Sequence, residues 1–518
     1  MRRLAAIDIG TNSVRSIIVE VADGQHYTVI DDEKAYTRLG EGLDEEKRLG
    51  EEPMARTLDA LRRMLGIARS MGASETRAIA TAAMRDAPNA AEFLRRISEE
   101  LGLDVEVITG EHEARLAFLS ARANVSLPGV AAVVDLGGGS LEIVRAAAGE
   151  IEEILSLPLG AVVLAERFVH TDPVSPREFK RLAEFVRASL LESLDVDDEP
   201  IATLVGSGGT LNALAAMTAA RSKRSYPSLQ GFEITLADVV HLLARLKRST
   251  AAERARVPGL PSSRVDIIVP GAAVIAETMQ VLGANRLVLN TKGIREGLVL
   301  EMLGSADAPG PPARIGSAVD FARRFNYDAE HADQVSRLAA SLLEELGPDL
   351  GLTSEHEELL HAAAIMHDVG YYISYERHHR QSHHLISHSQ LPGYTAREIR
   401  IIAAVARYHR GSLPKPSHDA LSLLDKRDRP TAIALAALMR AADGMDRARS
   451  GQVISVSVER AQDSITLVLS GEPSADSDLS VDAYGAQEKS DLLAQLLGKE
   501  VRIRVETSTS PGGVTPDE

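Results

Sequence analysis

The sequence predicts an α/β protein with two similar lobes, followed by a helical region and a small α+β region. Two segments carry the prediction of a duplicated fold: residues 4–15 read LAAIDIGTNSVR, and residues 131–144 read AAVVDLGGGSLEIV. Each is an apolar run that ends at an aspartate, turns through glycine and small polar residues, and returns to an apolar run. Because the same pattern opens two successive stretches of the chain, it indicates an internal duplication.

Strands and helices alternate in both predicted lobes. Short apolar segments bounded by polar residues predict strands, and apolar residues at helical spacing predict helices. In the first lobe, residues 1–125, the predicted strands are 4–9, 14–22, 25–31, 77–81 and 105–109, and the helices are 52–71, 89–101 and 110–121. In the second lobe, residues 126–305, the predicted strands are 131–135, 140–146, 202–206 and 286–290. Helices are predicted at 160–167 and 175–192, with more helices between the last two strands.

The pattern changes after the second lobe. Residues 304–313 read GSADAPGPPA, which is typical of a linker, and residues 316–447 predict helices only. A small α+β cap domain is predicted over residues 450–506. Its elements are two strands within 452–470, a helix at 484–497 and a strand at 500–506. The last residues, 507–518, have the composition of a disordered tail.

The composition limits the classes of function. The chain has 518 residues, no cysteine and a formal net charge of −17. That charge repels polyanions, so general nucleic-acid binding is not expected and a phosphate-rich ligand must be held by local cations, backbone N–H groups or metal. Zero cysteines exclude disulfides and thiolate metal sites. The sequence shows no signal region and no run for membrane insertion, so a cytoplasmic protein is expected.

The two Asp-Gly turns predict a phosphate and magnesium site. Asp8 and Asp135 stand at matching points of the repeat, each at the end of an apolar strand. Glycine lets the following backbone bend until several N–H groups point into one space, which suits phosphate. A nearby carboxylate suits Mg²⁺ bound to that phosphate. Two copies suggest two lobes that close on a single phosphate chain.

The sequence resembles the Ppx/GppA phosphatase family, the exopolyphosphatases and guanosine pentaphosphate phosphohydrolases, over residues 4–303. The resemblance rests on eight segments in order: DIGTNSVR at 8–15, LGEGL at 39–43, ATAAMRDAPNAAEFL at 80–94, GEHEARLAFL at 110–119, VDLGGGSLEI at 134–143, SLPLGA at 156–161, GSGGTLNAL at 206–214 and KGIREGL at 292–298. It implies two actin-like (ribonuclease H-like) lobes and hydrolysis of a terminal phosphoanhydride.

The resemblance also implies roles for individual residues. The metal ligands would be Asp8, Asp135 and Glu142. The phosphate-binding residues would be Gly10, Thr11, Asn12, Ser13, Arg15, Gly137, Gly138, Gly139, Ser140, Gly208, Gly209 and Thr210. Arg85, expected at the end of a strand, would neutralise charge in the transition state.

Glu113 is the candidate general base. It matches the glutamate that precedes Ala-Arg in the family's EARL segment, whereas His112 stands where the family often has an acidic residue. Spacing alone favours another interpretation, in which Glu113 is the third helical residue and caps the helix that starts from Gly110. The surrounding motif favours the base.

The helical region resembles HD-domain phosphohydrolases in the spacing of its histidines and aspartates. Two of its segments, HDVGYYISYERHHRQSHHLI at 367–386 and VARYHRGSLPKPSH at 405–418, resemble the C-terminal domain of long Ppx/GppA proteins. The spacing H…HD…D implies divalent-metal ligands at His331, His367, Asp368, His409 and Asp443. The fold expected here is therefore an all-α HD domain that holds a second divalent metal. Packed histidines such as His361 are the structural alternative, and the basic run 377–388 is also suited to line a channel for a long polyanion. Independent catalysis by this domain is not expected.

The sequence favours an exopolyphosphatase that uses Mg²⁺, or Mn²⁺ in its place, and a monovalent cation such as K⁺. The substrate would be inorganic polyphosphate and the assembly a homodimer. The alternatives are a guanosine pentaphosphate (pppGpp) phosphohydrolase and a catalytically weak regulator that binds guanosine penta- or tetraphosphate. A sugar kinase or chaperone ATPase of the same fold is disfavoured by the phosphatase-type segment at 110–119.

Overall fold

The computed structural model describes residues 2–21, 27–43, 48–194, 201–222, 226–304, 314–471 and 479–506. The chain divides into two compact units, residues 1–311 and 312–518. Most of the predicted linker (305–313) and the predicted tail (507–518) lie outside the described residues. In the described part of the chain, no helix is long and apolar enough to cross a membrane.

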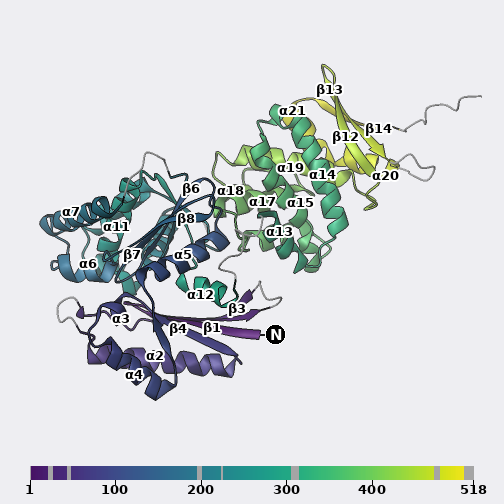
Figure 1. Cartoon of the computed structure of the whole chain (residues 1–518). Helices are drawn as coiled ribbons and strands as arrows, with labels where there is room; N and C mark the ends of the chain where they lie inside the picture. Colours follow the sequence, from purple (N-terminus) through teal and green to yellow (C-terminus); the bar gives the residue numbers. More distant parts are fainter. Residues whose placement is uncertain are drawn as a thin grey trace, which may run out of the picture. The chain divides into compact units, whose positions relative to one another are not determined.

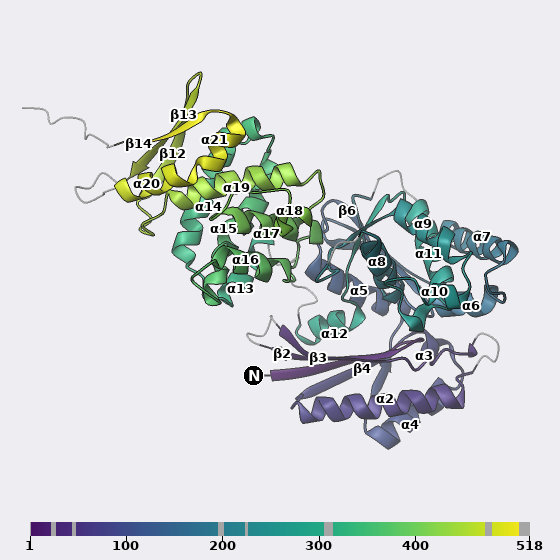
Figure 2. The ribbon, with the colours of Figure 1, turned by 180° about the vertical axis from the view of Figure 1, so that it is seen from behind.

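The first sheet has the strand order β3-β2-β1-β4-β5. β1 pairs antiparallel with β2 and parallel with β4, so the hairpin and the crossover share a central strand. Helices α2 and α4 cover one face of this sheet (Figures 1 and 2). The elements in chain order are β1 (Arg2–Ile9), β2 (Val14–Val21), β3 (Tyr27–Ala35), α2 (Glu51–Ser70), β4 (Glu75–Ala80), α3 (Ala82–Asp86), α4 (Ala90–Leu101), β5 (Val105–Val107) and α5 (Gly110–Asn124).

The second sheet repeats the first and adds one strand, in the order β10-β11-β9-β6-β7-β8. β6 pairs antiparallel with β7 and parallel with β9, as β1 does with β2 and β4. The internal duplication predicted from the sequence is therefore confirmed. The elements are β6 (Val130–Leu136), β7 (Leu141–Ala147), β8 (Glu150–Leu157), α6 (Ala161–Phe168), α7 (Pro176–Ser193), β9 (Thr203–Ser207), α8 (Gly209–Arg221), β10 (Glu233–Thr235), α9 (Leu236–Leu246), α10 (Ala251–Arg254), α11 (Ile268–Val281), β11 (Arg286–Leu289) and α12 (Ile294–Met302).

Helices α5 and α12 connect the two sheets. α5 packs against β6, β7 and β8 of the second sheet, whereas α12 follows the second sheet in the chain and packs against β1 and β2 of the first. The two helices touch at Gly297, where a Cβ atom would lie 2.0 Å from the carbonyl oxygen of Leu116. A side chain at that position would separate the helices, so glycine allows the close crossing.

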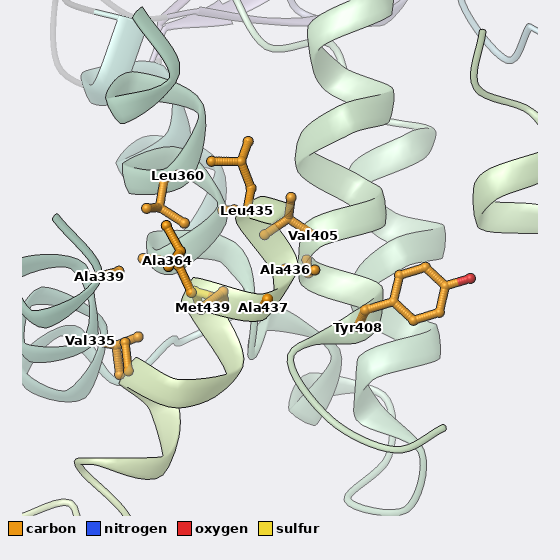
Figure 3. Packing of buried hydrophobic residues seen from close by; sticks show 14 of the residues in the cluster. Val335, Ala339, Leu360, Ala364, Val405, Tyr408, Leu435, Ala436, Ala437 and Met439 are labelled. Carbon is orange, nitrogen blue, oxygen red and sulfur yellow. The ribbon is translucent and has the colours of Figure 1, made fainter. Parts of the chain in front are cut away.

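The second unit begins with helices, and residues 316–447 contain no strand, as the sequence predicts. The helices are α13 (Arg314–Arg323), α14 (Ala329–Leu346), α15 (Glu357–Met366), α16 (His378–Ser387), α17 (Ala396–Tyr408), α18 (Asp419–Ser422) and α19 (Arg429–Gly444). Figure 3 shows side chains of α14, α15, α17 and α19 in one apolar core. The core is rich in alanine and leucine, which fits the scarcity of aromatic residues in the sequence.

A three-stranded sheet of order β12-β13-β14 completes the second unit. Its elements are β12 (Val453–Arg460), β13 (Ser464–Gly471), α20 (Ser480–Lys489), α21 (Asp491–Leu497) and β14 (Glu500–Glu506). The helix predicted at 484–497 is two helices, because α20 ends at Lys489 and Ser490 is the N-cap of α21. Both strands predicted within 452–470 and the strand at 500–506 are present.

Candidate active site

Two glycine turns follow the central strands β1 and β6. In the first turn, the N–H of Gly10 donates to the carbonyl oxygen of Ser13 at 3.1 Å. In the second, the N–H of Gly137 donates to the carbonyl oxygen of Ser140 at 3.0 Å. The two duplicated hairpins therefore close with the same backbone hydrogen bond, and each turn starts two residues after its aspartate.

The two turns lie in contact with each other. A Cβ atom on Gly138 would lie 3.1 Å from the Cβ of Thr11, and one on Gly139 would lie 2.8 Å from the Oγ1 of Thr11. Larger residues would push the turns apart, so the glycines allow both to approach one ligand.

A cavity of about 80 Å³ lies between these turns. Nearly all the residues expected from the sequence to bind phosphate line it, together with Asp8, Asp135 and Glu113. Helix α8 begins beside it at Gly209, and the N-cap residue Gly208 has a φ of +102°, which favours glycine. The N-terminus of a helix and the N–H groups of the two turns suit an anion.

Two of the expected residues are placed differently. Arg85 lies on the short helix α3 and not at the end of a strand, because the chain turns into α3 directly after β4. Thr210 does not line the cavity. Its fully buried side chain packs against α11, where a Cβ atom on Gly271 would lie 2.7 Å from its Oγ1.

Glu113 is 4% exposed and faces this cavity from helix α5. The helix has Thr109 as its N-cap, whose Oγ1 accepts from the N–H of His112. Glu113 is therefore the fourth helical residue, and its Oε2 accepts from Nη1 of Arg85 at 3.2 Å. The capping interpretation is wrong, because Thr109 caps the helix and the Glu113 carboxylate is directed to Arg85.

The pKa of Glu113 lies well above its ordinary value. Burial is the largest cause, the Glu142 carboxylate adds to it, and Arg85 opposes it. A carboxyl group with a raised pKa is a stronger base once it is ionised. Its position in a cavity between two anion-binding turns makes it suited to take a proton from water.

Three further carboxylates gather near Glu113. Burial raises the pKa of Asp8 to about 6, and burial with the neighbouring Asp135 raises the pKa of Glu142 to about 8. The pKa of Asp135 is raised by burial, although Ser207 Oγ donates to its Oδ1 at 2.7 Å. Burial is the largest cause of each of these three raised pKa values, and a cation bound among the acids would favour their ionised forms.

The donor set fits a divalent cation. Oδ1 of Asp8 and Oε2 of Glu142 are buried and accept no hydrogen bond in the described structure. Mg²⁺ prefers oxygen ligands and keeps several waters, so one or two carboxylates suffice to hold it. Asp8 and Glu142 therefore each have a free oxygen atom to offer. Asp8 and Asp135 line the cavity, whereas Glu142 does not line it and lies opposite Asp135 on β7.

Several cations and one acid at the cavity were missed from the sequence. Lys292, Arg295 and Glu296 line it at the start of α12, and Arg264 reaches it from the loop before α11. Burial, with the nearby Arg15, lowers the pKa of Arg264 to about 10. The segment KGIREGL directly follows a strand, which could have indicated the first three, but no local pattern marks Arg264.

A second cluster lies in residues 312–518, where the sequence predicts metal ligands. All five expected residues fall into two groups that share His367: His331, His367 and Asp443 form one, and His367, Asp368 and His409 form the other. In each group the potential ligand atoms lie within 4.8 Å of one another. His378 was not predicted from the sequence to join the cluster, and its Nε2 lies 3.3 Å from Oδ1 of Asp368.

The histidines of this cluster are held by their Nδ1 atoms. Nδ1 of His331 contacts Oδ2 of Asp446 at 2.7 Å. Nδ1 of the other three faces a backbone carbonyl three residues earlier, at 2.7 Å for His367 and His409 and 3.1 Å for His378. Such contacts place the hydrogen on Nδ1 and leave Nε2 as the ligand atom, which is the arrangement of metal-binding histidines.

The fold and the first site together define a class of protein. The fold is a two-lobed actin-like α/β fold, and it places two glycine turns, a helix N-terminus and buried carboxylates around one cavity. Such a site is suited to bind phosphate. Residues 17–306 match the model of the Ppx/GppA phosphatase family, and residues 313–483 match the model of Ppx/GppA phosphatase, domain III. The chain belongs to the Ppx/GppA phosphatase family and is a phosphoanhydride hydrolase.

Relatives support this assignment along most of the chain. A guanosine-5'-triphosphate,3'-diphosphate pyrophosphatase of Vibrio campbellii is 30% identical over 423 residues, which are 81% of this chain and 83% of the relative. The protein of the same name from Aeromonas hydrophila is 28% identical over 472 residues, 90% of this chain and 92% of the relative.

Solved structures cover a smaller part. The Aquifex aeolicus member of the Ppx/GppA family is 32% identical, with a TM-score of 0.52, and matches 59% of this chain and 98% of its own. An exopolyphosphatase from Cytophaga hutchinsonii is 27% identical, with a TM-score of 0.56, over the same shares.

Proposed function

We propose that the protein is a Mg²⁺-dependent exopolyphosphatase, with its active site at the cavity between the two glycine turns. The observation that carries the proposal is the position of Glu113, a buried carboxylate with a raised pKa among the acids Asp8, Asp135 and Glu142. This arrangement supports a general base beside a metal-held phosphate.

Each residue has a distinct role in the proposed reaction. The N–H groups of the turns at Gly10–Ser13 and Gly137–Ser140 hold the terminal phosphates, while Asp8, Asp135 and Glu142 hold Mg²⁺ directly or through water. Bound Mg²⁺ neutralises phosphate charge. Glu113 takes a proton from water, the water oxygen bonds to the terminal phosphorus, and the bridging P–O bond breaks. Orthophosphate and a chain shorter by one phosphate are released.

Arg85 orients the base in this proposal. Its Nη1 donates both to Glu113 Oε2 and to the carbonyl oxygen of Ile108 at 3.1 Å. The second contact fixes the guanidinium, so the carboxylate has a defined direction. The same cation is placed to oppose the negative charge that grows in the transition state.

The lining of the cavity supports polyphosphate as the substrate. Arg15, Arg264, Lys292 and Arg295 line it in a chain with a net charge of −17. None of the residues that line it is aromatic, so this cavity offers no ring on which a guanine base could stack. Repeating phosphates need only cations and N–H groups, which this lining supplies.

Hydrolysis of guanosine pentaphosphate is the second candidate, and the names of the curated relatives favour it. The same carboxylates would act on its terminal phosphoanhydride. The third candidate, a catalytically weak regulator that binds the same nucleotides, predicts binding without turnover.

We further propose that His331, His367, Asp368, His409 and Asp443 hold a second divalent metal and that residues 316–447 form an HD-type domain. The free Nε2 atoms of His331 and His367 support this proposal. We also propose that the protein is a cytoplasmic homodimer and that K⁺ activates it. Sedimentation tests the homodimer, and a comparison of activity in K⁺ and in Na⁺ tests the activation.

One assay separates the candidates. The purified chain is given long polyphosphate, short polyphosphate and guanosine pentaphosphate with Mg²⁺, and kcat/KM for phosphate release is measured. We expect the highest value on long polyphosphate. A higher value on guanosine pentaphosphate would replace the proposed substrate with the second candidate, and binding without release would favour the third.

A further inference from the structure

Three cations lie at the edge of the cavity between the two glycine turns. Arg15 of β2 and Lys34 of β3 are opposite each other in the antiparallel pair, so their side chains leave the same face of the sheet. Arg264 belongs to the second lobe, in the segment before α11. Arg15 and Arg264 line the cavity, whereas Lys34 lies outside its lining. Partial burial, together with the nearby Arg15 and Arg264, lowers the pKa of Lys34 to about 8.

Among the described residues, none of these three cations is in an ion pair with a carboxylate. Other cations nearby are paired. Nη1 of Arg295, which lines the same cavity, donates to Oδ1 of Asp32 at 2.5 Å. Nη2 of Arg38, which follows Lys34 in the chain, lies 3.0 Å from Oδ2 of Asp266. A group of like charges that no carboxylate pairs with costs free energy, and an anionic ligand would offset that cost.

Arg264 has the least favourable position of the three. Its guanidinium lies against Gly209, the first residue of α8, where a Cβ atom would lie 1.6 Å from Nη2. The N-terminus of a helix carries partial positive charge, so it repels a cation and attracts an anion. Arg264 is only 7% exposed, so water screens little of this repulsion. An anion bound at this place would contact both the guanidinium and the helix N-terminus favourably.

The cavity itself has room for only the end of a long ligand. Its volume is about 80 Å³. One water molecule takes about 10–15 Å³ of such volume, so the cavity admits a few groups of that size and not a chain. We propose that Arg15, Lys34 and Arg264 form a second anion site beside the cavity, which takes an internal phosphate group of a chain whose end lies in the cavity. This inference rests on the proposed function, because it places the rest of a polyphosphate substrate.

Tyr36 holds Lys34 at this site. The tyrosine hydroxyl is hydrogen-bonded to Lys34 and to Ser263, the residue before Arg264. Nζ of Lys34 also lies 4.4 Å from the centre of the Tyr36 ring. Tyr36 therefore connects the first lobe to the second where the three cations meet, and it acts as a positioning residue. Tyr36 is 42% exposed, so the site is open to solvent and a long ligand can leave it.

The chemistry of the three side chains defines the ligand. Two guanidinium groups and one ammonium group offer many N–H donors and no acceptor. A ligand must therefore present negative charge and several acceptor oxygens, and the planar guanidinium matches the oxygens of a phosphate group in pairs. An internal phosphate of a chain and a free orthophosphate share this chemistry. The experiment below distinguishes these two sources.

The site is tested by calorimetric binding to the full chain carrying Glu113→Gln, which lacks the proposed base and so keeps the ligand intact. Tetrapolyphosphate and orthophosphate are titrated with Mg²⁺ present. Addition of Lys34→Met should raise Kd for tetrapolyphosphate roughly tenfold, because a charged hydrogen bond is lost, and should change Kd for orthophosphate less than about twofold. Lys34→Arg keeps the cation and should retain the affinity. Lys180→Met makes the same change of charge at an exposed position on α7 and is the control.

Two results of this titration would overturn the inference. One is an unchanged Kd for tetrapolyphosphate in Lys34→Met. The other is an equal weakening of tetrapolyphosphate and orthophosphate, which would assign the site to free phosphate. Because binding is measured without turnover, this test is separate from that of the proposed function. A chain that binds tetrapolyphosphate through Lys34 but does not cleave it would support the site and contradict the proposed function.

The positioning role of Tyr36 and the place of Lys34 on the chain have their own tests. Tyr36→Phe removes the hydroxyl and should raise Kd for tetrapolyphosphate roughly threefold, but it should add nothing in Lys34→Met, because it acts through Lys34. Losses that add in the double variant would overturn the role of Tyr36. With Glu113 intact, Lys34→Met should raise KM for tetrapolyphosphate roughly tenfold and leave kcat unchanged, because Lys34 contacts a phosphate that does not react. A fall in kcat at an unchanged KM would place Lys34 at the reacting phosphate and overturn the inference.

Discussion

Asp8 and Asp135 occupy the same place in the two hairpins, but the residues opposite them differ in charge. Asp8 pairs in register with Arg15, whereas Asp135 pairs in register with Glu142. The duplicated turns therefore retain the same backbone, while one lobe presents a cation, proposed to bind phosphate, and the other a second carboxylate, proposed to bind metal. The repeat in the sequence predicts the shared backbone geometry of the two turns. The residue opposite each aspartate, Arg15 in one lobe and Glu142 in the other, sets the charge that each lobe presents.

The raised pKa of Glu142 gives a pH-dependent stability. Burial, with the neighbouring Asp135 carboxylate, raises the pKa of Glu142 in the folded protein from its ordinary value of 4.5 to about 8. Between these values the folded state binds more protons than the unfolded state, so the contribution of this group to stability falls as pH rises. Glu142→Gln removes the free-energy cost of ionising this buried side chain in the folded protein.

We therefore expect Glu142→Gln to raise Tm of the metal-free protein at about pH 9 and to change it little at about pH 5, where both side chains are neutral. Thermal unfolding in a chelating buffer at the two pH values measures the difference. The same change in Tm at both would show that Glu142 is not protonated in the folded protein.

The Asp8 carboxylate is expected to contribute to Mg²⁺ binding. Its Oδ1 is buried and accepts no hydrogen bond in the described structure. Asp8→Asn keeps the size and removes a negative charge, so the Mg²⁺ concentration for half-maximal activity should rise roughly tenfold or more, and excess Mg²⁺ should restore part of the rate. Asp104→Asn, an exposed position outside the cavity, is the control. An unchanged Mg²⁺ requirement would remove Asp8 from the metal site.

At the scale of elements, the sequence predicted the strands of both glycine turns and helix α5, which carries Glu113, but neither α3, which carries Arg85, nor α12 beside the cavity. β1, β2, β6 and β7 are apolar runs separated by Asp-Gly turns, so their pattern is local. β8 was missed because its sequence, EIEEILSL, is rich in glutamate, as an edge strand allows, and β10 has only three residues. The position of His378 in the cluster also escaped prediction, because it depends on how α16 packs and not on its own surroundings in the sequence.

Substitutions of two glycines should have opposite effects, because Gly139 lies at the contact between the two turns and Gly66 lies on the exposed side of α2. Gly139→Ala would place Cβ 2.6 Å from the Cβ of Ala82, so the turn must shift, activity should fall, and stability should drop by about 1–3 kcal/mol. Gly66→Ala, on the exposed side of α2 with nothing within 4 Å, should instead stabilise by about 0.5–1 kcal/mol.

Phosphate-release assays and urea unfolding of both variants measure these effects. Full activity in Gly139→Ala would show that the turns do not need their close approach, and destabilisation by Gly66→Ala would show that the helix interior is not open at that position.

At the scale of the whole molecule, two compact units each carry one proposed site. The solved relatives match 59% of this chain and nearly all of their own, which indicates that the first unit suffices for the fold of the catalytic lobes. Residues far apart in the sequence, such as Asp8 and Lys292, meet in the first site. Only the resemblance to a family indicated that such segments belong together, because no local pattern encodes a contact between them.

A chain that ends at residue 304 should therefore cleave short polyphosphate with kcat within roughly threefold of the full protein. On long polyphosphate, KM should rise roughly tenfold or more, since further binding sites along one chain raise its effective concentration. Steady-state kinetics on both substrates tests this expectation. Equal losses on both would mean that residues 312–518 support the folding of the first unit and not the binding of long chains.

The most direct test of the account is phosphate release from polyphosphate by Glu113→Gln. The amide keeps the size of the side chain and cannot accept the proton, so kcat should fall about 10²–10⁴-fold. Glu111→Gln, an exposed position on the same helix, should retain the wild-type rate, and circular dichroism should show both variants folded. A folded Glu113→Gln protein that keeps more than a third of wild-type turnover would contradict the account.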